Sequence, residues 1–279
     1  MTEKWLIAPD QERVIDIATA SRLKVGLVGG QIDVIAHDEP GIRIEVSGVT
    51  VKDLRIESAG TEIEIDHPQL GWDNFLEVFR NFGTGGPKAQ ISVAVPRGIA
   101  LNLGVVSAGA LVSGLANDAR LNTVSGELIV DTLTGDLSVN SVSGDVQIRE
   151  LTGALNANSV SGDVSVTGDV SKATVDIVSG ATWIDAAGRI GSVNVNSVSG
   201  ATTVRLDGAL AANYVTRTMN GHVTIDGVDR GGNGPSSYTG THGEPAGAFV
   251  DLRVNSVSGD ITVLRRMPTT VADDAEWES

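Results

Sequence analysis

The chain has 279 residues, a formal net charge of −15, 41% hydrophobic and 4% aromatic residues, and no cysteine. The acidic balance argues against nucleic-acid binding, which needs clustered Lys and Arg, and disfavours docking on anionic lipid. Without cysteine the chain can form neither a disulfide framework nor a thiolate metal site.

The N-terminal residues, from Met1 to Asp10, contain no apolar run of the kind that a signal peptide requires. No later stretch approaches the roughly 18 apolar residues of a membrane-spanning helix. We therefore expect a cytoplasmic protein without membrane insertion, and exposure at the cell surface stays an open alternative.

Short segments with β-type apolar spacing follow, at residues 14–17, 23–28, 32–35, 42–46, 54–56 and 63–65. Their spacing along the chain is irregular. Terminal repeats of a stacked protein are usually atypical, because one of their faces meets water. We therefore interpret residues 1–100 as irregular β coils that form a cap.

Residues 69–86 interrupt this pattern with a cluster of aromatic side chains. Trp72, Phe75, Phe79 and Phe82 recur at helical spacing, which predicts a short amphipathic helix inserted into the cap. Such a helix could pack over the rest of the protein. Because clustered aromatic residues favour interface cores, these four residues are also candidates for partner binding or self-association.

A fixed repeat dominates residues 101–266. The triplet Val-Ser-Gly recurs with its glycines at Gly126, Gly144, Gly162, Gly180, Gly200 and Gly259. The first three intervals are 18 residues and the next is 20. Such a period predicts a single parallel β-solenoid with about 18 residues per coil, in which Gly supplies the positive φ of a corner.

The repeat predicts columns of side chains that run along the solenoid. We expect a first internal column to hold Val124, Val142, Val160, Val178 and Val198. A second would hold Leu128, Val146 and Val164, and a third Val130, Ile148, Val166, Ile184 and Val204. On this interpretation V142D would bury a lone charge and unfold the stack locally.

A polar column precedes the triplets by two residues, at Asn122, Asn140, Asn158, Asn196 and Asn255. Asn side chains stacked along the axis can hydrogen-bond to one another. We interpret this column as a structural ladder rather than a ligand site.

Trp183 lies within the regular repeat, between Thr182 and Ile184. Because these two neighbours are predicted to point inward, the Trp183 ring should point outward. It is therefore a further candidate for partner binding, although one exposed ring is not a sugar subsite.

No pattern in the chain predicts an active site or a cofactor. The four His residues lack metalloprotease spacing, and no Gly-x-Ser-x-Gly elbow leads from a strand into a helix. Asp136, Asp145, Asp163 and Asp260 follow corner glycines, as in calcium-binding β-rolls. One Asp per unit supplies too few oxygens for Ca²⁺. We expect no catalytic residues, no cofactor and no metal site.

The repeat ends irregularly. A long Gly-rich loop is predicted at residues 227–247, because Gly231 to Ser237 is dominated by turn-forming residues. A final coil returns at residues 249–264, and residues 267–279 form an acidic tail.

Two motifs carry a family resemblance. The strings Val95-Pro96-Arg97-Gly98-Ile99 and Asn140-Ser141-Val142-Ser143-Gly144-Asp145-Val146, with residues 25–34, resemble the bacterial "putative adhesin" family of β-strand-repeat domains of unknown function. The resemblance covers roughly residues 20–265. It implies a β-solenoid without an established activity, and it transfers no catalytic residues.

These observations favour a non-enzymatic binding or scaffold protein that acts through protein–protein interaction. Two alternatives stay open. One is a filament former comparable to bactofilins, whose coils would stack end to end. The other is a carbohydrate-binding protein at the cell surface.

Overall fold

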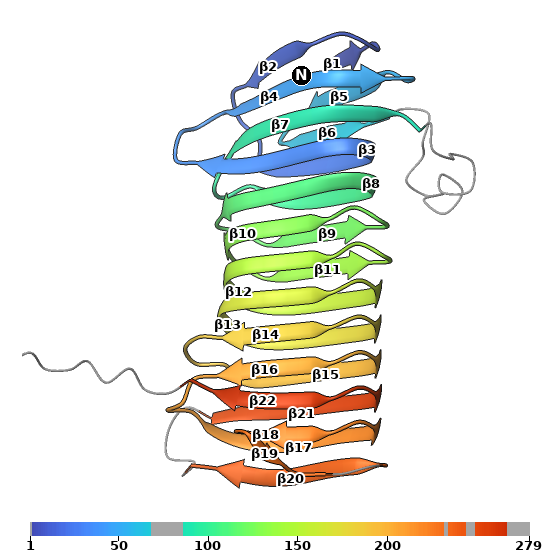
Figure 1. Cartoon of the computed structure of the whole chain (residues 1–279). Helices are drawn as coiled ribbons and strands as arrows, with labels where there is room; N and C mark the ends of the chain where they lie inside the picture. Colours follow the sequence, from blue (N-terminus) through green and yellow to red (C-terminus); the bar gives the residue numbers. More distant parts are fainter. Residues whose placement is uncertain (1, 68–85, 232–233, 244–248, 267–279) are drawn as a thin grey trace, which may run out of the picture.

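The computed structural model describes residues 2–67, 86–231, 234–243 and 249–266, and every regular element in these ranges is a β-strand (Figure 1). The all-β class is therefore confirmed for the described residues. These ranges contain no helix that could cross a membrane. Residues 69–85 of the predicted helix near 69–86 lie outside the described residues. The predicted tail at 267–279 also lies outside them.

The strands of the N-terminal part are β1 (Thr2–Ile7), β2 (Arg13–Ile17), β3 (Arg22–His37), β4 (Ile42–Thr50), β5 (Leu54–Ala59), β6 (Glu62–Asp66) and β7 (Lys88–Pro96). Those of the central part are β8 (Ala100–Leu115), β9 (Ala119–Thr123), β10 (Leu128–Thr134), β11 (Leu137–Ser141), β12 (Val146–Ser161), β13 (Val164–Ser179), β14 (Thr182–Ala186), β15 (Ser192–Ser199) and β16 (Thr202–Leu206). Those of the C-terminal part are β17 (Ala211–Asn220), β18 (Val223–Ile225), β19 (Val228–Asp229), β20 (Ser236–His242), β21 (Phe249–Ser258) and β22 (Ile261–Arg265).

The chain winds into stacked coils with two flat faces. Face I contains β9, β11, β15, β21 and β17, and face II contains β10, β14, β16, β22 and β18. The long strands β3, β8, β12 and β13 bend from one face to the other, so each contributes to both. The stacked rungs are visible in Figure 1.

Successive central coils pair in parallel at the predicted 18-residue offset. Leu128 lies beside Val146, and Val146 lies beside Val164. The second and third predicted columns are buried, with exposures of 0 to 2%. Each buried aliphatic side chain of this kind contributes about 1.5–3 kcal/mol to folding, so the two columns stabilise the stack substantially.

The first predicted column is wrong for four of its five members. Val142, Val160, Val178 and Val198 are 46 to 50% exposed, and Val124 alone is buried. The physical reason is the phase of the strand. Alternation continues through the end of β11, so Ser141 points inward and Val142 points outward. The corner after Val142 then resets the phase before Val146.

The N-terminal end is closed by antiparallel strands. On face I, β6 pairs in parallel with β3, and β5 and then β1 add antiparallel. On face II, β7 pairs in parallel with β3, and β4 and then β2 add antiparallel. The six predicted β segments at residues 14–65 lie within these strands, whereas β1 and β7 are strands that the sequence analysis missed.

The C-terminal coil does not occupy the position that its place in the sequence suggests. β21 lies between β15 and β17, and β22 lies between β16 and β18. The coil at 211–225 therefore skips one rung, which the last coil fills. Side-chain pairing favours this order, because Asn255 Nδ2 donates to Asn196 Oδ1 at 3.0 Å. The coil at 211–225 carries Arg217 at the position of Asn255 and could not form this bond.

The loop predicted at 227–247 contains two strands, which corrects the expectation of irregular structure there. β20 pairs antiparallel with β17, and β19 pairs antiparallel with β18. β21 occupies one edge of β17 and leaves the other edge open. The Ser, Thr and Tyr residues of β20 pair with this open edge and therefore form a strand. Antiparallel strands thus cap both ends of the stack (Figure 1).

Candidate binding surfaces along the coil stack

The corners after β9 and β11 are each built by an inward hydroxyl and a glycine. The Ser141 hydroxyl donates to the Gly144 carbonyl oxygen at 2.7 Å and accepts from the Gly144 amide at 3.1 Å. Thr123 makes the same pair of bonds to Gly126. Buried polar groups need such partners, so the hydroxyl closes the turn from inside. The intervening Val142 lies outside the β11 corner, whereas Val124 in the β9 corner is buried.

The outward valines form one row, which we call the valine ladder: Val142, Val160, Val178, Val198, Val257 and Met219. Their exposures range from 46 to 61%. The rungs are adjacent, because the Ser161 amide donates to the Val142 carbonyl oxygen at 2.7 Å and the pairings of β13, β15, β21 and β17 continue the row. The ladder lies at the corner that follows β11, on the right-hand side in Figure 1.

The predicted Asn ladder runs beside the valine ladder on face I. Asn140 Nδ2 donates to Asn122 Oδ1 at 2.9 Å, and Asn158 Nδ2 donates to Asn140 Oδ1 at 3.0 Å. Asn196 Nδ2 donates to Asp176 Oδ1 at 2.7 Å. The structural interpretation of this column is therefore supported. One link is missing, because Asp176 has no N–H to donate to Asn158.

Replacing Asp176 by Asn should complete the Asn ladder. The new Nδ2 can donate to Asn158 Oδ1 while the new Oδ1 still accepts from Asn196. We expect D176N to raise the free energy of unfolding by about 0.5–1 kcal/mol, measured by urea denaturation. E127Q removes one exposed negative charge away from the ladder and controls for net charge. Equal effects of D176N and E127Q would contradict the ladder explanation.

The repeated Asp residues hold neighbouring coils together. Asp118 Oδ1 accepts from the Asp136 amide at 2.9 Å, and Asp136 Oδ1 accepts from the Ala154 amide at 3.1 Å. At the other corner, Asp145 Oδ1 accepts from the Asp163 amide at 2.9 Å. These bonds explain the Gly-Asp pattern, and within the described residues no three acidic or His side chains are grouped around a metal-sized site.

Trp183 points outward from face II, as predicted, and is 39% exposed. The Arg205 guanidinium lies 5.9 Å from the centre of its ring, a cation–π distance. Arg205 and Arg266 also bond the buried Asp185 carboxylate. Burial raises the pKa of Asp185, but the hydrogen bonds and the positive charges of the two Arg residues together outweigh it and hold the pKa below its ordinary value. The cluster is thus internally paired.

The four predicted aromatic contact residues, Trp72, Phe75, Phe79 and Phe82, lie outside the described residues. The structure therefore does not bring them together with Trp183 or separate them from it. Their segment starts beside His67, which is 1% exposed. His67 Nδ1 lies 3.2 Å from the Asp53 carbonyl oxygen, and its Nε2 is buried without a partner among the described atoms.

His67 should make the stability of the cap pH-dependent. Burial lowers the pKa of His67 below 6.5, although the Asp53 hydrogen bond and the Asp66 charge act in the opposite direction. The unfolded chain therefore takes up this proton first, and stability falls as the pH drops below 6.5. We expect H67N, which cannot titrate, to lose less free energy of unfolding than the wild type between pH 7.5 and 5.5. Equal losses in the two proteins would refute this role.

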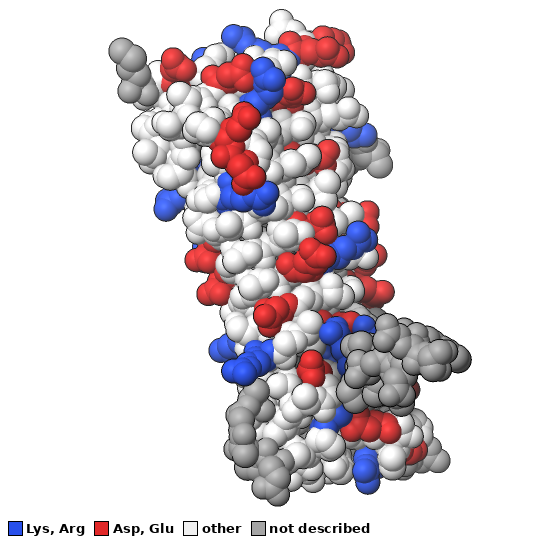
Figure 2. Space-filling model, turned by 90° about the vertical axis from the view of Figure 1, so that its left-hand side faces the viewer, with Lys and Arg blue, Asp and Glu red and all other residues white. Residues whose placement is uncertain are grey.

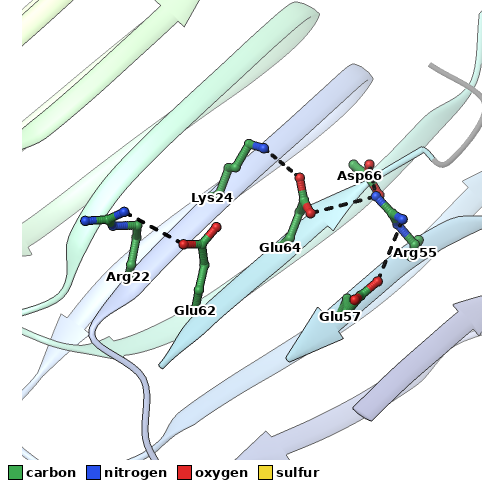
Figure 3. A network of polar contacts seen from close by, with 7 residues as sticks. All are labelled: Arg22, Lys24, Arg55, Glu57, Glu62, Glu64 and Asp66. Atoms are coloured by element: carbon green, nitrogen blue, oxygen red, sulfur yellow. Dashed lines mark hydrogen bonds and ion pairs between the residues drawn. The ribbon is translucent and has the colours of Figure 1, made fainter. Parts of the chain in front are cut away.

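The largest charged cluster of the cap is a network of seven side chains on β3, β5 and β6 (Figure 3). Lys24 Nζ lies 2.7 Å from Glu64 Oε1, and Arg55 Nη2 lies 2.5 Å from Asp66 Oδ2. The hydrogen bonds that Arg55 donates to the Asp66 carboxylate raise the pKa of Arg55 above its ordinary value. Each charge in the network has an opposite charge as neighbour, which is typical of a stabilising surface network rather than a ligand site.

Figure 2 shows the left-hand side of the view in Figure 1, opposite the corner that carries the valine ladder. Basic and acidic side chains alternate over this surface, and neither sign forms a continuous field. An open groove along face I likewise mixes Arg22, Arg120 and Lys172 with Asp118 and Asp136. This alternation gives no strong electrostatic preference for one type of ligand.

The valine ladder is thus the clearest continuous surface in the described part of the chain, and sequence reasoning missed it. A signal was available. In Asn140-Ser141-Val142 the polar Asn and the Val occupy alternate positions of one strand, and therefore one face. Whichever side the Asn ladder occupies, Val142 had to share it.

The sequence matches the model of the Toastrack DUF4097 family over residues 18–264, close to the range of the predicted resemblance. No curated protein matches the chain. A "putative lipid binding protein" from Parabacteroides distasonis covers 92% of this chain and 96% of its own, with a TM-score of 0.50 and 14% identity. At this identity the likeness concerns the fold alone.

Two further solved structures each cover 92% of this chain. A "putative cell adhesion protein" from Clostridium sporogenes has a TM-score of 0.32, 12% identity and 99% coverage of its own chain. A "putative adhesin" from Bacteroides fragilis has a TM-score of 0.39, 15% identity and 100% coverage.

Proposed function

We propose that this chain, which belongs to the Toastrack DUF4097 family, is a non-enzymatic β-solenoid scaffold. It would bind a protein partner through the valine ladder. The family description names no activity. The observation that carries this proposal is the continuity of the ladder. Single exposed aliphatic residues are normal on protein surfaces, whereas six in one row form a contiguous apolar strip.

The geometry of the ladder defines the partner that it fits. Adjacent strands lie about 4.8 Å apart, so six rungs extend over about 24 Å. The flanking column consists mostly of uncharged Asn side chains, with one acidic member, Asp176, and one basic member, Arg217, and it can form a polar rim. We infer a protein surface with an apolar stripe of similar length, such as one side of a helix of about 16 residues.

Site-specific photo-crosslinking can identify this partner in cells. A photoreactive phenylalanine analogue at Val160 should capture a defined protein, whereas the same analogue at the exposed Thr152, on face II, should not. The captured protein is then purified for binding measurements. Equal capture at the two positions would count against the ladder.

Binding variants then test the ladder directly by calorimetry. V160D/V178D places two charges in the apolar strip, and we expect the Kd to rise at least tenfold because both charges must be desolvated on binding. T152D/N156D adds the same charge at exposed polar positions and should leave the Kd unchanged. A Kd that V160D/V178D does not change would refute the proposal.

The two alternative functions gain less support. The carbohydrate alternative would rely on Trp183, whose ring is already engaged by Arg205. The filament alternative requires strand edges at both ends that accept another copy. The N-terminal edge strands β1 and β2 carry charged residues, whereas the C-terminal edge strand β20 carries none.

A further inference from the structure

The two ends of the coil stack present different strand edges. At the C-terminal end, β20 pairs with β17 through one edge, and no described strand pairs with its other edge. An unpaired edge offers a row of backbone N–H and C=O groups to another strand. Soluble proteins usually protect such an edge with charge, proline or very short strands.

The edge of β20 carries none of these protections. Its sequence, Ser236 to His242, contains no Lys, Arg, Asp, Glu or Pro over seven residues. By contrast, the N-terminal edge strands are charged: β1 carries Glu3 and Lys4, and β2 carries Arg13 and Asp16. The other C-terminal edge, β19, has two residues and is too short to pair stably.

We propose that two copies of this chain associate tail to tail through antiparallel pairing of their β20 strands. A strand edge that meets its own copy about a two-fold axis always pairs antiparallel, so the edge is complementary to itself. Face I of one copy then continues into face I of the other. Because the N-terminal edges are charged, this contact closes as a dimer and does not propagate.

Local charge permits this contact despite the net charge of −15. β17 and β20 together contain one residue of the Lys, Arg, Asp and Glu group, Arg217. The end of face I therefore lacks the acidic side chains that would repel a second copy.

β20 is also held in place before any partner arrives. The Tyr238 ring packs 6.4 Å from that of Tyr214, and the Arg230 guanidinium lies 5.2 Å from the centre of the Tyr238 ring. An edge that is already ordered loses little entropy on pairing. Since the contact is one strand wide, we expect a micromolar Kd rather than a tight complex.

Sedimentation velocity of the full chain tests the proposal. A protein concentration of 100 μM is about a hundredfold above a 1 μM Kd. At this concentration the wild type should sediment as a species of twice the 28.8 kDa protomer mass. T239K/T241K adds charge at two exposed positions of β20 and should give a monomer with an unchanged Tm. T152K/N156K, in a strand paired on both edges, should stay dimeric. A monomeric wild type, a dimeric T239K/T241K variant or concentration-dependent growth beyond a dimer would each overturn the proposal.

The absence of native cysteine allows a second test of orientation. T239C should form an intermolecular disulfide on mild oxidation, because the centre of the strand lies near the two-fold axis. V14C, at an exposed position of the N-terminal edge strand β2, should not. Preferential crosslinking of V14C would show that the copies meet at the other end.

Discussion

V166D is expected to destabilise the central coils strongly. Val166 is 0% exposed and lies between Ile148 and Ile184 in the third internal column. A carboxylate there would lose its hydration without gaining a partner, at a cost of about 4 kcal/mol or more. We expect a fall of at least about 10 °C in Tm, followed by circular dichroism.

V160D provides the matched control, because it introduces the same charge six residues earlier in the same rung. Val160 is 50% exposed in the valine ladder, so its Asp variant should unfold within about 0.5 kcal/mol of the wild type. Similar melting of V160D and V166D would mean that the assignment of inward and outward positions is incorrect.

The repeat predicts the interior of the central coils well for a physical reason. Parallel strands with an 18-residue offset place equivalent residues directly above one another, as Leu128, Val146 and Val164 show. Once the period is known, two of the three apolar columns follow from alternation around the corner glycine. Burial then confirms them.

The same reasoning failed for Val142, because spacing across a corner was treated as spacing within a strand. Side-chain alternation is defined only along continuous extended backbone, and the corner at Ser143 to Asp145 breaks it. Counting from within β11 places Ser141 inside and Val142 outside. The valine ladder, and with it the proposed binding surface, therefore depends on one change of phase that the repeat alone does not specify.

The order of the last coils could not be derived from the period either. Residues 211–225 and 249–265 both fit the repeat, and either could follow β16. The choice depends on long-range contacts, such as the bond between Asn255 and Asn196 that Arg217 cannot reproduce. Sequence order predicts neighbours most of the time, but here a strand inserted from the C-terminus is the better partner.

Of the candidate site, sequence reasoning predicted the outward position of Trp183 correctly and placed the remaining candidates in residues 69–86. Those four aromatic residues lie outside the described residues, so their role stays a prediction. Exposed aliphatic residues are harder to recognise, since a buried and an exposed Val look the same in a repeat. The difference lies in the corner geometry that positions them.

Corner geometry is also the basis of the second large effect, which we expect for G200A. Gly200 has a φ of 125°, a conformation that L-residues rarely adopt. A Cβ at this position would lie 2.0 Å from the Gly180 carbonyl oxygen and 2.7 Å from its carbonyl carbon. Both atoms belong to the backbone of the adjacent coil, so the two coils would have to separate.

We expect G200A to lower the free energy of unfolding by about 3 kcal/mol or more, because backbone strain and steric overlap add. Urea denaturation measures this change. G191A is the matched control, since a Cβ there would meet its nearest atom, the Ser171 carbonyl oxygen, at 3.6 Å. If both variants unfolded at the wild-type midpoint, close approach between coils at the Val-Ser-Gly corner would not be what requires glycine there.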